Sequence, residues 1–290
     1  MTRKKWTQND LPDLSGRTMV VTGASSGIGL VTARELCAHR AKVILAVRDV
    51  EKGNEIAKDF VGNYDVRALN LADLESVRSF ADQWTGELDV LINNAGIMMA
   101  PAFRTIDDFE LHIGTNHLGP FALTNLLLPY ITDRVVTVSS ILHRQGRIHL
   151  DDLHFDSRSY NAMTAYRDSK LANLLFTLEL QRRLSESASK VRAVAAHPGI
   201  ARTNLVAHVG GVSGLVNSLS QRLCNDAVKG ALPTLYVATQ DIPGGSYLGP
   251  SGIAHLRGYP VIHGTSKRAK DIEMARKLWD VSAELTKTGQ

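Results

Sequence analysis

Apolar residues follow two alternating patterns along this chain. Short runs rich in β-branched residues predict buried strands, expected at residues 17–22, 42–47, 66–71, 88–92, 134–140, 191–196 and 246–248. Between them, apolar residues at every third or fourth position predict helices, expected at residues 30–40, 50–60, 73–84, 107–130, 163–184, 226–239 and from 266 onwards. Strands that alternate with helices pair in parallel and are covered on both faces. The sequence therefore predicts an α/β fold with a doubly wound parallel sheet.

No shift in composition marks a second domain. We interpret residues 1–15 as a polar leader and residues 16–290 as a single domain. Residues 200–224 are rich in glycine, serine and valine and have weak helical periodicity, which favours a loop that covers the substrate. A content of 44% hydrophobic and 21% charged residues is typical of a soluble globular protein.

Charge and cysteine content narrow the class of protein further. The net charge of +4 comes from dispersed residues, and the one dense basic group, at residues 3–5, indicates a solvated tail rather than a nucleic-acid partner. Cys37 and Cys224 form neither a disulfide framework nor a metal-ligand pattern, which suits a reducing compartment. No stretch approaches the roughly 18 apolar residues of a membrane helix. We expect a cytoplasmic protein with no integral membrane segment.

A glycine-rich turn joins the first predicted strand to the first predicted helix, the context that dinucleotide binding requires. Gly23 permits a tight turn, Gly27 lets the backbone approach a pyrophosphate, and Gly29 lets the helix pack closely on the strand. The helix N-terminus then offers N–H groups to the phosphates. The spacing differs from the more common G-x-G-x-x-G, and a simple connection is the alternative.

The end of the second strand indicates which cofactor is preferred. An acidic residue there holds the ribose 2′-hydroxyl, whereas an arginine accommodates a 2′-phosphate. This chain has Val47 followed by Arg48, whose guanidinium can chelate the phosphate. The sequence therefore favours NADP(H), with NAD(H) possible if Asp49 serves the ribose.

Tyr166 and Lys170 lie four residues apart in a predicted helix and so share one face. A nearby cation favours the phenolate and lowers the tyrosine pKa, which would make the pair a candidate general acid/base. Taken alone, such a pair is common in helices. His143, His149 and His154 cluster before this helix without a metal-ligand spacing, so we predict no metal site.

Together, these motifs resemble the short-chain dehydrogenase/reductase superfamily over about residues 16–285. Residues 22–29 are similar to its TGxxxGIG turn, residues 93–96 to its NNAG element, and residues 198–203 to its PGxxxT segment. The resemblance implies a Rossmann-type fold. It also implies cofactor contacts at Gly23, Ser25, Ser26, Gly27, Ile28, Gly29, Arg48, Asn70, Leu71, Asn94, Ala95, Gly96, Tyr166, Lys170, Pro198, Gly199, Ile200 and Thr203.

The same resemblance implies a catalytic set of Asn116, Ser140, Tyr166 and Lys170. Tyr166 would exchange a proton with the substrate oxygen, and Ser140 would hold that oxygen. Lys170 would lower the tyrosine pKa and bind the nicotinamide ribose. Asn116 would link Lys170 to solvent through its backbone and a water.

The long gap between Ser140 and Tyr166 is most similar to the retinol-dehydrogenase-like branch of the superfamily. That branch implies NADP(H) and a lipophilic alcohol, aldehyde or ketone as substrate. Many members carry an N-terminal membrane helix, which we do not find in this sequence, and Asn70 replaces a frequent aspartate beside the adenine. A homo-dimer or homo-tetramer through residues 107–130 and 163–184 is also implied.

Three functions from different classes stay open at this point. An NADP(H)-dependent carbonyl reductase or alcohol dehydrogenase is favoured. A nucleotide-bound regulator or scaffold without turnover is the second, although intact Ser140, Tyr166 and Lys170 argue against it. The third is an epimerase or dehydratase of the extended relatives, whose glycine turn is usually spaced differently.

Overall fold

One eight-stranded sheet forms the centre of the protein. The computed structural model describes residues 5–199 and 227–289. Within them the strand order is β3-β2-β1-β4-β5-β6-β7-β8, with all pairs parallel except β7 and β8, which pair antiparallel. The strands are β1 (Thr18–Thr22), β2 (Lys42–Val47), β3 (Asn63–Ala68), β4 (Leu88–Asn93), β5 (Ile131–Val138), β6 (Arg192–Ala196), β7 (Tyr247–Pro250) and β8 (Pro260–Ile262). This parallel-dominated sheet confirms the predicted fold class.

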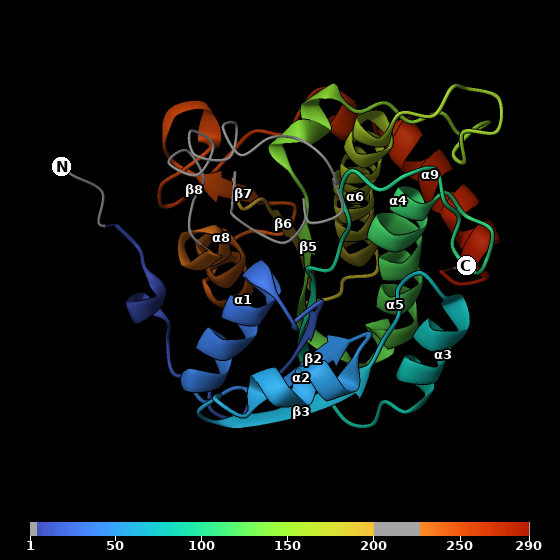
Figure 1. Ribbon diagram of the computed structural model, residues 1–290. Helices are drawn as coiled ribbons and strands as arrows, with labels where there is room; N and C mark the ends of the chain where they lie inside the picture. The colour runs from blue at the N-terminus through green and yellow to red at the C-terminus, as the bar shows by residue number, and fades with distance from the viewer. Residues whose placement is uncertain (1–4, 200–226, 290) are drawn as a thin grey trace, which may run out of the picture.

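Helices cover both faces of the sheet and bury two separate apolar clusters against it (Figure 1). One face carries α1 (Gly27–Ala38), α2 (Val50–Ala57) and α8 (Ala227–Thr239). The other carries α3 (Leu74–Asp82), α5 (Gly119–Leu127), α6 (Ala162–Glu186) and α9 (Ile272–Thr286). Burial on both faces explains why the central strands are continuous apolar runs in the sequence.

The order of the strands fixes where a ligand can bind. The chain moves outward from β1 to β3 and then returns to place β4 on the other side of β1. At such a reversal the two connections leave in opposite directions and open a crevice at the carboxyl ends of the strands. The turns after β1 and β4 lie at this switch point.

Several predicted boundaries differ from the structure, and the strand expected at residues 134–140 spans Ile131–Val138. The third strand was expected at residues 66–71 but spans Asn63–Ala68, because this edge strand is held by backbone pairing with β2 and is only half-buried. The helix expected at 107–130 is broken into α4 (Leu111–Ile113), a π-helical turn (Gly114–Leu118) and α5. The terminal helix was expected from residue 266 but begins at Ile272, because the side chain of Asp271 caps its first turn.

The polar leader is part of the packed structure from residue 5 onwards. Leu11 and Leu14 are buried in the cluster beneath α1, and the backbone N–H of Leu14 donates to the carbonyl of His39. The indole of Trp6 meets the ring of Tyr236 on α8 edge-to-face. This segment therefore contributes to the core.

The C-terminal helix α9 packs on α5 and α6, the two elements through which we predicted self-association (Figure 1). Trp279 meets the ring of Phe121 edge-to-face at 4.9 Å and stacks on Phe176 at 5.8 Å. Ser282 is hydrogen-bonded to His117 at 2.9 Å. Part of the surface of α5 and α6 is thus covered by the chain's own helix.

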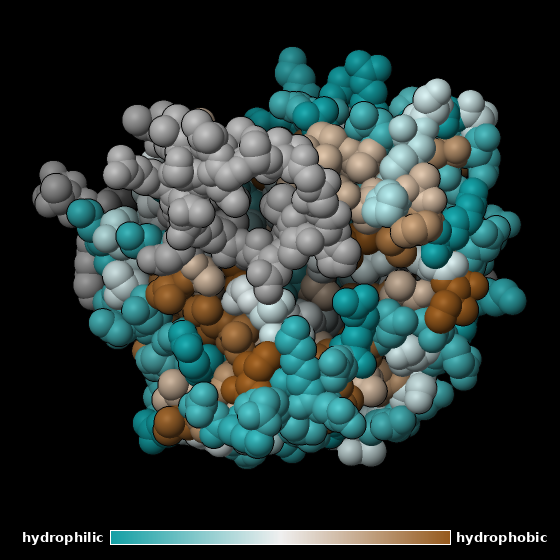
Figure 2. Space-filling view, viewed as in Figure 1, coloured by the Kyte–Doolittle hydropathy of each residue, from teal (hydrophilic) through white to brown (hydrophobic). Residues whose placement is uncertain are grey.

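Among the coloured residues of Figure 2, hydrophilic ones predominate at the surface, and hydrophobic ones gather in separate patches. The exposed large hydrophobic residues come from several different segments: Val61, Phe103, Ile106, Tyr130, Ile262 and Ile272. None of the helices in the described part of the chain has the length and apolar character needed to cross a membrane.

Replacing Trp279 with alanine should lower the free energy of unfolding by about 3–5 kcal/mol, because it empties an aromatic cluster that is closed to solvent. Urea unfolding of both proteins measures the difference. Ile272→Ala on the same helix is the control, since its side chain is 59% exposed and its loss should change stability by less than about 0.5 kcal/mol. Equal effects of the two substitutions would contradict this packing.

Candidate active site

The turns after β1 and β4 are joined by the side chains of Thr22 and Asn94. The hydroxyl oxygen of Thr22 accepts from the backbone N–H groups of Asn94 and Ala95, each at 3.0 Å. The side-chain amide of Asn94 donates to the carbonyl of Thr22 at 2.8 Å. These bonds hold the NNAG residues against the glycine turn at the switch point.

Glycine is required at two positions of this junction. Gly23 has φ +67°, and a Cβ there would lie 2.9 Å from Cα of Ala95. A Cβ on Gly29 would lie 2.3 Å from the amide nitrogen of Asn94 and 2.4 Å from the carbonyl oxygen of Gly23. Both glycines therefore permit the tight turn and close helix packing that the sequence predicted.

The N-terminus of α1 follows directly on the glycine turn of this junction. Ser26 is its N-cap residue but makes no side-chain capping hydrogen bond, and Gly27 adopts a positive φ of 56°. The first-turn N–H groups therefore lack a side-chain cap, which fits an anionic pyrophosphate. Ser25 and Ser26 are half-buried in the same turn, and Ile28 anchors the helix in the core.

Arg48 and Asp49 follow β2 at the edge of the crevice. Arg48 is exposed and makes no hydrogen bond or ion pair within the described residues. The carboxylate of Asp49 instead caps α2 by accepting from the backbone N–H of Lys52 at 2.9 Å. The Arg48 guanidinium is thus available for a phosphate, whereas the Asp49 carboxylate, which could otherwise bind the ribose, already caps α2.

Asn70 and Leu71 follow β3. The side-chain oxygen of Asn70 accepts from the backbone N–H of Ala72 at 3.2 Å, so its amide shapes the turn. Leu71 is buried, and its carbonyl lies so close to Gly119 that a Cβ there would approach it to 2.2 Å. This contact brings the first turn of α5 against the end of β3.

Lys170 brings an ammonium group into the interior at the carboxyl end of β5. Its residue is 4% exposed, and Nζ donates to the carbonyl of Val138 at 3.0 Å. A Cβ on Gly96 would lie 3.2 Å from Nζ and 3.0 Å from the side-chain oxygen of Asn116. The NNAG turn, Asn116 and Lys170 therefore meet at one point.

Asn116 lies in the π-helical turn Gly114–Leu118, a type of irregularity that is frequent at functional sites. Its amide nitrogen donates to the carbonyl of Ile97 at 3.0 Å and to the hydroxyl of Ser169 at 2.9 Å. Its oxygen accepts from the backbone N–H of Ile97 at 2.8 Å. The side chain thus fixes the segment after Gly96 to the helix that bears Lys170.

Tyr166 is 5% exposed, and its phenol interacts with the side chain of Ser140, which follows β5. Burial raises the pKa of the Tyr166 phenol, and the interaction with Ser140 partly offsets this rise. The expected lowering of this pKa by Lys170 is therefore wrong for the protein alone, since Nζ lies 5.8 Å from the ring centroid and bonds to Val138. Burial also lowers the pKa of Lys170 to about 8.

The strand β6 delivers Pro198 and Gly199 to the same edge of the sheet. Gly199 has φ +71°, and its N–H donates to Nδ1 of the buried His197 at 3.3 Å. The predicted contacts Ile200 and Thr203, and the loop 200–224, lie outside the described residues.

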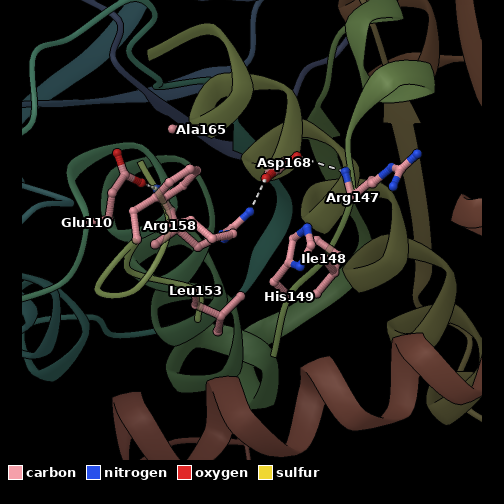
Figure 3. Close-up of a pocket in the computed structure, with 10 residues that line it drawn as sticks. Glu110, Arg147, Ile148, His149, Leu153, Arg158, Ala165 and Asp168 are labelled. Carbon is pink, nitrogen blue, oxygen red and sulfur yellow. Dashed lines mark hydrogen bonds and ion pairs between the residues drawn. The ribbon is translucent and has the colours of Figure 1, made fainter. Parts of the chain in front are cut away.

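The long connection between Ser140 and Tyr166 packs on a different face of α6. Asp168 is two residues from Tyr166, so its side chain leaves the helix on the other side. It accepts from the backbone N–H of Arg147 at 2.7 Å and pairs with Arg158 at 3.8 Å, in the small pocket of Figure 3. The pocket thus lies between the connection, α4 and the face of α6 that carries Asp168, and Glu110 is among its lining residues.

Two buried residues of the site were missed by sequence reasoning. Glu110 is 3% exposed, His112 is fully buried, and Nδ1 of the imidazole lies 2.8 Å from the carboxylate. The ring of His112 also meets that of Tyr166 edge-to-face at 6.4 Å. The sequence offered one indication of their role, since His112 precedes Asn116 by four residues and so shares its face of the predicted helix.

Fold and site together define an α/β protein with a doubly wound sheet, a class that binds ligands at the carboxyl edge of the sheet. The sequence model of the short chain dehydrogenase family matches residues 17–212. Human retinol dehydrogenase 11 is 42% identical over 94% of this chain and 86% of its own length, and human retinol dehydrogenase 13 is 41% identical over 94% and 85%. A crystal structure of an uncharacterized protein from Mycobacterium paratuberculosis is 53% identical, covers 98% of each chain and superposes with a TM-score of 0.86.

This chain therefore belongs to the short-chain dehydrogenase/reductase family, and it is similar to members named retinol dehydrogenases. It is an NAD(P)-dependent oxidoreductase. The predicted enzyme class and the resemblance to the retinol-dehydrogenase-like branch are thereby confirmed.

The free energy of unfolding should fall as the pH is lowered from about 6.5 towards 4. Burial lowers the folded-state pKa from 6.5 to about 4 for His117 and His143 and to about 3 for His197. The unfolded chain therefore binds more protons in this range and gains stability relative to the folded protein. Urea unfolding at several pH values between 4.5 and 7.5 measures the slope.

Asp168 acts in the opposite direction, because burial raises its folded pKa to about 6 and the folded protein then takes up a proton first. Because three histidines act in one direction and one carboxyl group in the other, the free energy of unfolding should still fall as the pH is lowered. The Asp168→Asn variant should therefore show a steeper loss between pH 6 and 4.5. Stability that is constant or rises on acidification to pH 4.5 would contradict the neutral state of these histidines.

Proposed function

We propose that this enzyme transfers a hydride between NADP(H) and a small lipophilic carbonyl or alcohol substrate, with Tyr166 as the proton donor and acceptor. The observation that carries the proposal is the meeting of Tyr166, Ser140 and Lys170 in a buried space at the carboxyl end of β5. The relatives named retinol dehydrogenases support an alcohol and its carbonyl compound as the substrate pair.

The residues at the switch point fit a nicotinamide dinucleotide. The glycine turn and the N-terminus of α1 would hold its pyrophosphate. Asn70, Leu71 and the NNAG turn would lie along its adenosine half, and Lys170 with Pro198 and Gly199 along its nicotinamide half. When bound, the cofactor donates or accepts the hydride.

The proton is the part of the reaction that this chain supplies. In reduction, the phenol of Tyr166 donates its proton to the substrate oxygen, and Ser140 donates a hydrogen bond to the same oxygen. The raised pKa keeps the phenol protonated before the reaction, as a proton donor requires. Lys170, whose Nζ lies 5.8 Å from the ring centroid, would bind the nicotinamide ribose beside the phenol.

The preference for NADP(H) rests on Arg48. Its guanidinium is exposed and without a partner in the described structure, whereas the neighbouring carboxylate of Asp49 caps α2. A free guanidinium binds a phosphate with two parallel hydrogen bonds. NAD(H) lacks the 2′-phosphate and would gain nothing from this residue.

We propose that the enzyme is cytoplasmic, because its composition and its two cysteines suit a reducing compartment. A homo-dimer or homo-tetramer stays a prediction. Because α9 covers part of α5 and α6, such an assembly would have to use the surface beside α9.

Tyr166→Phe should lower kcat with an aliphatic aldehyde and NADPH by about 100- to 10,000-fold, because it removes the transferable proton and keeps the ring. Initial rates follow NADPH absorbance, and fluorescence titration gives the Kd of NADPH. That Kd should stay within about threefold, since a hydroxyl is lost from a site with many other contacts.

Tyr64→Phe on the edge strand β3 is the matched control and should keep the wild-type rate. Turnover that survives Tyr166→Phe would overturn the catalytic assignment. Tight NADPH binding without turnover of any aldehyde, ketone or alcohol would favour the regulator instead.

Arg48→Ala should raise the KM for NADPH by about 10- to 100-fold, the cost of one charge-assisted phosphate contact, and leave the KM for NADH nearly unchanged. Arg40→Ala is the control, because Arg40 is also exposed but pairs with Asp13. Predominant activity of the wild type with NADH, or equal effects on both cofactors, would contradict the role of Arg48.

A further inference from the structure

We propose that Glu110 and His112 are positioning residues for the reaction, which set the backbone of residues 97–100 and the ring of Tyr166 beside the substrate. The proposal rests on the proposed function, since it assigns residues 97–100 as one wall of the substrate site. These residues belong to the loop after β4 and to the short helix α4, and none of the motifs above includes them.

The Glu110 carboxylate is fully engaged as an acceptor. It caps α4 by accepting from the backbone N–H groups of His112 at 2.9 Å and Ile113 at 2.8 Å. Its third bond, at 2.8 Å, is to Nδ1 of the His112 ring. A carboxylate with a backbone-fixed position thus holds the proton of His112 on Nδ1.

With its proton on Nδ1, the ring of His112 has Nε2 free as an acceptor. The backbone N–H of Ala100 donates to this nitrogen at 3.3 Å. The carbonyl of the same residue accepts from the Tyr160 hydroxyl at 2.7 Å. Both backbone polar groups of Ala100 are therefore held by side chains from elements distant in sequence.

The other end of the segment is held by Asn116, which binds both backbone groups of Ile97. His112 and Asn116 are one helical turn apart, so one short stretch of chain fixes both ends of residues 97–100. Met98 and Met99 lie between these two points and are half-buried, and Met99 has a positive φ of 58°.

This segment continues directly from Gly96, whose Cα lies against the Lys170 ammonium group. The His112 ring meets the Tyr166 ring edge-to-face at 6.4 Å, so the same imidazole touches the proton donor and anchors the segment. Two adaptable methionines on a fixed backbone suit a lipophilic substrate of variable shape. The position of the wall relative to the phenol therefore depends on the Glu110–His112 pair.

His112→Asn tests the proposal, because its amide nitrogen can still donate to Glu110 but nothing replaces Nε2 as the acceptor for Ala100. With decanal and NADPH, kcat/KM should fall by about 10- to 100-fold, since small misplacements of a reacting group have effects of this size. Tyr160→Phe releases the carbonyl of Ala100 and removes the 3.3 Å contact of the Tyr160 hydroxyl with Nδ1 of His112, so it should act in the same direction. The Kd of NADPH should stay within about threefold in both variants.

His117→Gln is the matched control. His117 is equally buried and lies five residues further along, but it bonds to Ser282 on α9. It should lower the melting temperature and leave kcat/KM within about threefold of wild type. Wild-type kcat/KM in His112→Asn, or a parallel loss of NADPH affinity in that variant, would overturn the positioning role.

Nitrogen-15 spectra of labelled histidine give a second readout that needs no turnover. The spectra should show the proton of His112 on Nδ1, and Glu110→Gln should change this tautomer. A proton on Nε2 in the wild type would overturn the proposal. If the tautomer is as expected but the wild type reduces neither decanal nor any other carbonyl, the proposed function fails and the positioning of Ala100 stands.

Discussion

A buried ammonium group is the constraint on which the rest of the site depends. Lys170 is almost completely removed from solvent and has the carbonyl of Val138 as its hydrogen-bond acceptor. Burying a cation is unfavourable unless polar groups surround it. A Cβ at position 96 would lie 3.2 Å from Nζ and 3.0 Å from the side-chain oxygen of Asn116, so a side chain there would press on both groups. The backbone of Lys170 is also fixed, because its carbonyl accepts from Ser139 at 2.7 Å.

The topology of the sheet explains why these groups meet. Lys170 is on α6, Val138 ends β5, and Gly96 follows β4, and parallel pairing brings the ends of neighbouring strands to one edge. The glycine turn after β1 reaches the same edge and is bonded to the NNAG turn through Thr22. A cofactor laid along this edge would therefore extend from the phosphate-binding turn to the proton donor.

The state of Tyr166 shows how burial and charge compete in this site. Desolvation raises the phenol pKa and desolvation also lowers the Lys170 pKa, so each group moves towards its neutral form. A neutral phenol is the form that can donate a proton in carbonyl reduction. The Glu110–His112 pair holds an imidazole in a fixed position at the edge of the same ring.

The sequence by itself determined the α/β class and the glycine turn, because these depend on local periodicity and short spacings, whereas the predicted catalytic set came from the resemblance to a family. The boundaries of β2 were also predicted correctly, since that strand is apolar along almost its whole length. Only the tertiary structure decided the start of β3, the π-helical turn at Asn116, and the antiparallel β8. It also decided that His112 binds Ala100 and that Lys170 binds Val138. These features arise from pairing and hydrogen bonding between distant segments, and local sequence patterns carry no information about which distant groups will meet.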